Sequence, residues 1–206
     1  MKTAIFKFAS ALVILMSTLC VGAHASATTL DFEGQTSYAT VGNTYASQGV
    51  TFDHGIIFAN VCDYSLPDCF YNSVDYPPHS GTGVIGTTGT DPEPLTIYFA
   101  SPVSNVSLWY SSPGNFTLSA YDAVGNLIHS VTQPADTGSM AEISLNDSGI
   151  AYVTFSNDFG GAGFDVLDDL SFTPAASPVP EPSSIALLGT GILAAAGTMR
   201  GRLRTR

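Results

Sequence analysis

Residues 116–131 read Phe-Thr-Leu-Ser-Ala-Tyr-Asp-Ala-Val-Gly-Asn-Leu-Ile-His-Ser-Val, and this stretch decides the fold class. Phe116, Leu118 and Ala120 alternate with polar residues, so they share one face of an extended strand. Val124-Gly125-Asn126 permits a tight turn, after which a second apolar run begins. The stretch therefore predicts a β-hairpin with one face in a core.

The rest of the body repeats this pattern. Between Thr28 and Thr173, short runs of β-branched and aromatic residues are separated by Gly, Pro, Asn and Ser, and none reads as an amphipathic helix. Such a succession is typical of an antiparallel β-sandwich. Residues 64–80 and 81–94 are rich in Pro or Gly and are predicted to be surface loops. The predicted strands are Thr29–Glu33, Gly49–Asp53, Ile56–Asn60, Leu95–Phe99, Val103–Tyr110, Phe116–Asp122, Leu127–Thr132, Glu142–Leu145, Ala151–Ser156 and Leu167–Phe172.

Charge is distributed very unevenly along the 206 residues. Two lysines stand at positions 2 and 7 and four arginines at positions 200, 202, 204 and 206, so no basic residue lies between. Only Glu181 of the 17 acidic residues follows Pro180, which leaves 16 carboxylates between Ser26 and Pro180. Nucleic acid is excluded as a natural partner, because binding to phosphates depends on Lys and Arg. A divalent cation fits better, and the alternative is that acidity only keeps the protein soluble.

The first 25 residues have the features of a signal peptide. Two lysines precede an apolar run, residues 8–21, and Ala23 and Ala25 supply the small residues that signal peptidase reads. We expect export with cleavage after Ala25, and cleavage after Ala27 is the alternative. The mature body is then residues 26–174.

A second targeting segment closes the chain. Residues 175–182 are a proline-rich linker, residues 183–199 are uncharged and mostly apolar, and residues 200–206 carry the four arginines. As a helix, residues 183–199 would extend about 25 Å, slightly less than the roughly 30 Å of a hydrocarbon core. Because arginines stay on the cytoplasmic side, we expect one transmembrane helix, a basic cytoplasmic tail and a body beyond the inner membrane.

The order of these tail elements resembles a known sorting signal. Val179, Pro180, Glu181 and Pro182 precede the apolar segment and the arginines, which is the arrangement of the PEP-CTERM sorting domain. The resemblance implies that exosortase, a membrane cysteine protease, cuts near this motif. It also implies transient anchoring in the inner membrane, then release to the outer envelope or the extracellular matrix of a polysaccharide-producing Gram-negative host. Prolines hold such a segment extended, in the form that a protease binds.

Two cysteines remain after export, Cys62 and Cys69. The oxidising compartment favours a disulfide between them, which would pin the loop that contains Tyr64. A catalytic thiol is the alternative, but a nucleophile needs a positioned base, and no local signature provides one.

Carboxylates are concentrated at both ends of the body. Asp31 and Glu33 lie on the first predicted strand, and Asp168 and Asp169 lie on the last. This pattern is similar to the start and finish of jelly-roll modules, among them MAM-type and carbohydrate-binding domains. The resemblance implies a jelly-roll-like sandwich in which these carboxylates hold a structural Ca²⁺, whose oxygen ligands they could supply. The alternative is that they only cap strand ends that face solvent.

No catalytic motif was found, which predicts a protein that is not an enzyme. Aromatic residues are the remaining indication of a ligand, because sugars stack on aromatic rings. Tyr64, Tyr71 and Tyr76 in one loop are the predicted glycan-binding residues, whereas Trp109 is expected in the core. We therefore expect a non-catalytic surface or matrix protein associated with exopolysaccharide, as in a biofilm. The alternative is a secreted hydrolase that acts on polysaccharide.

Overall fold

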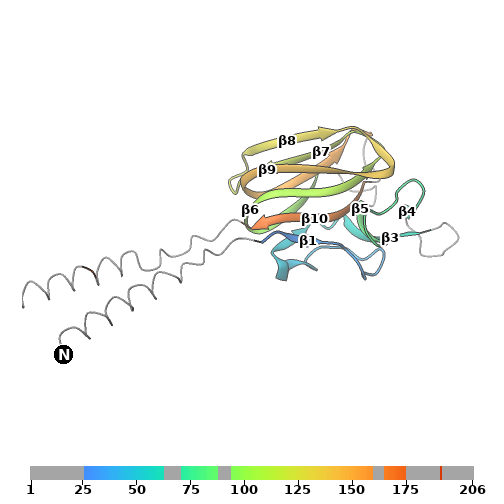
Figure 1. Cartoon of the computed structure of the whole chain (residues 1–206), viewed down its shortest axis with the longest axis horizontal. Coiled ribbons are helices and arrows are strands. Elements are labelled where there is room, and N and C mark those ends of the chain that lie inside the picture. Colours follow the sequence, from blue (N-terminus) through green and yellow to red (C-terminus); the bar gives the residue numbers. More distant parts are fainter. Residues whose placement is uncertain (1–25, 63–70, 88–93, 160–164, 175–190, 192–206) are drawn as a thin grey trace, which may run out of the picture. The chain divides into compact units, whose positions relative to one another are not determined.

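The computed structural model describes residues 26–62, 71–87, 94–159 and 165–174, together with Gly191. Within these ranges the chain forms strands, turns and one short 3-10 helix (Figure 1). Ala25–Ala175 cluster as one unit by their contacts. The elements are β1 (Thr28–Leu30), η1 (Ala46–Gln48), β2 (Val50–Phe52), β3 (Ile56–Cys62), β4 (Tyr71–Asn72), β5 (Gly83–Thr87), β6 (Leu95–Ser112), β7 (Phe116–Tyr121), β8 (Leu127–Gln133), β9 (Asp136–Asn157) and β10 (Val166–Pro174).

The strands form one sheet that curls over on itself. Its order is β4-β3-β5-β10-β6-β9-β7-β8, with β1 added to β10 and β2 added to β6. The long strands β6 and β9 take part in both halves, because their pairing shifts register between Tyr98 and Val106. Bulges of this kind bend a strand and let it pass from one layer to the other.

Two facing layers result from this bend. The first layer contains β2, residues 95–99 of β6, residues 152–157 of β9, β7 and β8. The second layer contains β4, β3, β5, β10, β1 and the remaining parts of β6 and β9. The prediction of an all-β, sandwich-like body is therefore confirmed.

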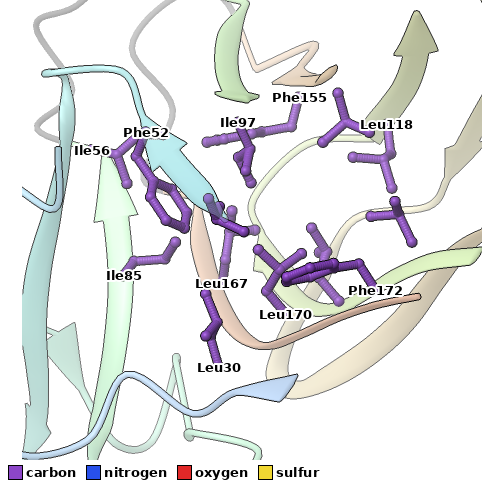
Figure 2. Packing of buried hydrophobic residues seen from close by; sticks show 14 of the residues in the cluster. Leu30, Phe52, Ile56, Ile85, Ile97, Leu118, Phe155, Leu167, Leu170 and Phe172 are labelled. Carbon is purple, nitrogen blue, oxygen red and sulfur yellow. The ribbon is translucent and has the colours of Figure 1, made fainter. Parts of the chain in front are cut away.

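The core lies between the layers and is built from alternating positions of both. Ile97 and Phe155 come from the first layer, whereas Ile85, Leu167 and Phe172 come from the second, and all are nearly inaccessible to solvent (Figure 2). The main cluster contains only residues between Leu30 and Phe172. Burial of apolar surface on this scale is the main stabilising term in folding, so the body has what it needs to fold without the terminal segments.

The hairpin at residues 116–131 forms as expected. β7 pairs with β8, and Asp122 accepts hydrogen bonds from the N–H groups of Val124 and Asn126 across the turn. In two cases, two strands that were predicted separately are parts of one long strand. Leu95–Phe99 and Val103–Tyr110 belong to β6, because Pro102 causes only a bulge at the layer boundary, and Glu142–Leu145 and Ala151–Ser156 belong to β9.

The prediction of a surface loop at residues 81–94 is wrong for its first part. Gly83–Thr87 is strand β5, and all five residues are buried between β3 and β10. Its glycines are required by close neighbours. A Cβ on Gly83 would lie 2.6 Å from the carbonyl oxygen of Phe32, and one on Gly86 would lie 2.5 Å from the Tyr71 hydroxyl. A strand buried on both faces lacks the alternation by which strands are recognised.

Several predictions lie outside the described residues. These are the signal peptide with Ala23 and Ala25, the side chains of Cys62 and Cys69, and the linker, apolar segment and basic tail after Pro174. Gly191 is the one described residue of the predicted transmembrane helix. Among the described residues, none belongs to a helix with the length and hydropathy that a membrane crossing requires.

Candidate functional site

The carboxylates predicted at the two ends of the body converge on one segment, residues 79–83. The Glu33 side chain accepts hydrogen bonds from the N–H groups of Thr82 (2.9 Å) and Gly83 (2.7 Å). Asp168 accepts one from the N–H of Ser80 (2.9 Å). The first and last predicted strands lie side by side, since β1 pairs with β10. Asp31 is exposed, and its side chain accepts a hydrogen bond from the N–H of Glu33 (3.2 Å).

Asp169 completes this arrangement through His79. Its Oδ2 lies 2.6 Å from Nδ1 of His79, and its Oδ1 accepts a hydrogen bond from the Ser80 hydroxyl (3.1 Å). The His79 ring stacks on Trp109, with centroids 3.7 Å apart and planes 10° apart. Trp109 therefore lies on the outer face of the second layer, half-buried under His79, and not in the core as expected. The Ser80 hydroxyl bonds to the carboxylate and not to the imidazole, so these three residues do not form a nucleophilic triad.

Binding of a calcium ion by these carboxylates stays a prediction, and the structure shows a different set of partners for them. Calcium needs several oxygen ligands directed at one point, and at least one oxygen of each of Glu33, Asp168 and Asp169 already accepts an N–H or O–H group of residues 79–83. Among the described residues there is no group of three His, Cys, Asp or Glu side chains arranged for a metal. The geometry favours a structural role in which the carboxylates fasten a segment to the second layer.

Asp168 makes this attachment dependent on pH. Burial raises its pKa from 3.8 to about 6, the neighbouring charge of Asp169 adds to this, and the N–H of Ser80 opposes it. The folded protein thus binds this proton more tightly than the unfolded chain does. The resulting stabilisation is complete below about pH 4 and is lost as the pH rises through about 6.

Substitution of Asp168 by Asn should remove this dependence. Between pH 4 and pH 7, wild-type protein should lose up to about 3 kcal/mol of unfolding free energy relative to Asp168→Asn, as the pKa difference requires. Urea unfolding of both proteins across this range measures the effect. Stability curves that stay parallel would show that Asp168 does not titrate in the folded protein.

The predicted glycan-binding tyrosines are not arranged as an exposed platform. Tyr64 lies outside the described residues. Tyr71 is buried, with only 3% of its surface exposed, and its hydroxyl donates to the carbonyl of Thr87 (3.1 Å). Tyr76 is half-buried against it, with ring centroids 5.3 Å apart. The prediction is therefore wrong for Tyr71, because its ring fills a small core between this loop and the second layer.

An aromatic row that the sequence analysis missed lies on the outer face of the first layer. Tyr98 on β6 is opposite Tyr152 on β9, which is opposite Tyr121 on β7. The rings of Tyr121 and Tyr152 are stacked, with centroids 4.9 Å and planes 5° apart. Tyr98 is tilted by 39° from Tyr152 at 6.0 Å and is 45% exposed. Its neighbour on β2 is the short Thr51.

Apart from the exposed Leu127, which is opposite Tyr121 on β8, hydroxyl-bearing residues occupy the rest of this face. Residues that are partners in register point to the same face of a sheet, and so do residues two apart along one strand. Two further rows of outward-pointing side chains therefore run parallel to the tyrosine row. The Ser119 and Ser130 hydroxyls are 2.8 Å apart, as are those of Thr117 and Thr132. We call this surface the hydroxyl face. It consists of Thr51, Thr96, Tyr98, Thr117, Ser119, Tyr121, Ser130, Thr132, Tyr152, Thr154 and Ser156.

Comparison with known proteins identifies the tail. The model of the PEP-CTERM protein-sorting motif matches residues 178–202, so the chain carries this motif, as predicted. The motif indicates a protein that is exported, anchored and then processed by exosortase. No curated protein matches the chain.

Among solved structures, the body is similar to β-sandwich domains of adhesins and carbohydrate-binding modules. The K2 adhesin domain of Lys-gingipain is 15% identical over 72% of this chain and 99% of that domain, with a TM-score of 0.47. The CBM22-1 xylan-binding domain of Paenibacillus barcinonensis Xyn10C is 12% identical over 74% and 97%, with a TM-score of 0.42. TmCBM61, solved with β-1,4-galactotriose, is 11% identical over 70% and 94%, with a TM-score of 0.30.

Proposed function

We propose that this protein is a non-catalytic, carbohydrate-binding component of the outer envelope or extracellular matrix, released there after exosortase removes its tail. The observation that carries the proposal is the row formed by Tyr98, Tyr152 and Tyr121 on the outer face of the first layer. Pyranose rings present an apolar face of C–H groups, and an aromatic ring beside hydroxyl groups offers both kinds of contact that a sugar makes.

The position of the tyrosines supports a binding role over a structural one. A tyrosine at the centre of a sandwich stabilises the fold by burial, but Tyr98 has 45% of its surface exposed. Pairing with Tyr152 and Tyr121 restricts the rings to few rotamers, so little side-chain entropy remains to be lost when a ligand binds. Tyr98 therefore offers an exposed and partly preorganised ring on the hydroxyl face.

The test is replacement of Tyr98 by Ala in the body, residues 26–175. The variant should bind the host's extracellular polysaccharide about tenfold more weakly than wild type, the loss expected for one aromatic contact of about 1.4 kcal/mol. Affinity electrophoresis in gels that contain the polysaccharide measures this, with circular dichroism as the check on folding.

Tyr38→Ala is the matched control, because Tyr38 is also exposed (55%) but lies before β2, outside the hydroxyl face. It should bind like wild type. Equal losses in Tyr98→Ala and Tyr38→Ala, or wild-type binding by Tyr98→Ala, would contradict the proposed site.

A further inference from the structure

The hydroxyl face has no charged side chain among its eleven residues. Apart from His129, which precedes Ser130 on β8 and lies 2.9 Å from the Asp147 carboxylate, the ionisable groups nearest to it along the strands are acidic and stand at its rim. Asp53 follows β2 and accepts the N–H of Thr96 (2.8 Å), Asp122 follows Tyr121, and Asp158 follows β9. The N–H and side-chain amide of Asn126 lower the pKa of Asp122, so this carboxylate stays ionised at neutral pH. A ligand on the hydroxyl face is thus surrounded by negative charge and meets none beneath it.

The whole body has the same character. It has 16 carboxylates and no Lys or Arg between Ser26 and Pro180. A polymer of uronate or sulfated sugars would therefore find no fixed cation to pair with and would be repelled as it approached. An amine-bearing polymer would be drawn to the carboxylates at the rim and elsewhere, and not to the tyrosine row.

From this we infer that the hydroxyl face binds a neutral, extended polysaccharide chain. The inference rests on the proposed function and specifies its ligand class. The three rows of side chains run across strands that are about 4.8 Å apart, which is close to the length of one pyranose unit in an extended chain. Successive sugars can therefore meet equivalent side chains on successive strands.

The chemistry of the rows suits uncharged sugar hydroxyls. A Ser or Thr hydroxyl donates one hydrogen bond and accepts up to two, as a sugar hydroxyl does, so each can satisfy the other in either direction. The pairs Ser119 with Ser130 and Thr117 with Thr132 hold neighbouring hydroxyls 2.8 Å apart. Each pair uses one of its two donors, and Ser130 and Thr132 are the exposed members that a ligand can reach.

The experiment compares neutral polymers with charged forms of the same backbone. Soluble β-glucan, xylan and galactan, and the carboxymethylated form of each, are titrated into the body (residues 26–175) by calorimetry, with chitosan as the cationic polymer. EDTA is present throughout so that no divalent cation bridges two acidic partners. We expect at least one neutral polymer to bind, and its carboxymethylated form to bind at least tenfold more weakly.

The outcomes separate this inference from the proposed function. Two results would contradict a neutral ligand but not carbohydrate binding. One is a carboxymethylated polymer that binds as tightly as its neutral parent. The other is chitosan that binds more tightly than every neutral polymer, with an affinity that salt abolishes. Failure of every polymer, and of the host's own polysaccharide, would overturn both.

A variant designed to gain affinity for a charged polymer tests whether the polymer lies on the hydroxyl face. Ser130 and Thr132 are exposed on the edge strand β8, so Ser130→Lys with Thr132→Lys adds two cations without disturbing the core. This variant should bind the carboxymethylated polymer at least tenfold more tightly than wild type does, and salt should reverse the gain. Thr40→Lys with Ser47→Lys, at exposed positions outside the face, is the control and should gain less. Equal gains would show that the polymer does not lie on this face.

Discussion

Replacing Phe116 with Ala should lower the unfolding free energy of the body by about 3 to 5 kcal/mol, the range for deleting a buried aromatic ring. Phe116 is fully buried at the start of the hairpin that indicates the fold class. Its ring stacks on Tyr110, with centroids 4.5 Å apart, and lies 6.0 Å from Phe155. These contacts join both halves of the curled sheet, so a cavity here weakens the packing of one layer on the other.

Thr117→Ala is the matched control for this substitution. Thr117 is the next residue of β7 and points to the opposite face, where it hydrogen-bonds to Thr132. Its loss should cost about 1 kcal/mol or less. Urea unfolding measures both variants, and a Phe116→Ala protein as stable as Thr117→Ala would contradict the placement of Phe116 in a core between two layers.

Replacing Pro180 and Pro182 together with Ala should leave the C-terminal tail attached in the native host. The motif match at residues 178–202 includes both prolines. We expect their rigid, extended backbone to be the form that exosortase binds, and alanines allow a helix to continue from the apolar segment. The double variant should stay in the membrane fraction at full length, whereas wild-type protein should appear outside the cell without residues 183–206.

Pro178→Ala tests whether the effect belongs to the Pro-Glu-Pro motif. This proline is the first residue of the match but precedes Pro180-Glu181-Pro182, so the variant should be processed like wild type if the effect belongs to these three residues. Mass spectrometry of the mature protein gives the answer. Detection of Arg206 in mature wild-type protein would contradict removal of the tail.

The parts of the fold that depend on local sequence were predictable. The β7–β8 hairpin was found because apolar alternation and a turn containing Gly125 lie within sixteen residues. Strand β5 was missed because Gly83 and Gly86 serve the close approach of Phe32 and Tyr71, which come from other parts of the chain. The joining of two predicted strands into β6 or β9 also depends on a bend between layers, and local patterns do not encode it.

The candidate site also has a part that the sequence predicts and a part that depends on the assembled fold. Carboxylates at the two ends of the body were expected to meet, and Glu33, Asp168 and Asp169 do lie on a common segment. Their hydrogen-bond donors, residues 79–83, were not foreseen, since they are about fifty residues from Glu33 and ninety from Asp169.

The tyrosine row was missed for a related reason. Tyr98, Tyr121 and Tyr152 each stand at an outward position of a strand, which the alternation around them already indicated. What brings them into one row is the pairing of β6 with β9 and of β9 with β7, and this register is a property of the assembled sheet. Aromatic residues clustered in one loop were easier to see, but in the structure Tyr71 of that loop is buried.

Binding of a polysaccharide to the hydroxyl face is tested most directly by NMR, which maps the bound polymer on the body. The isotope-labelled body (residues 26–175) is titrated with the neutral polymer that binds it, and amide and aromatic shifts are followed. The largest changes should fall on Tyr98, Tyr121 and Tyr152 and on the hydroxyl rows beside them. Changes centred on Tyr76 and Trp109, on the outer face of the second layer, would contradict it.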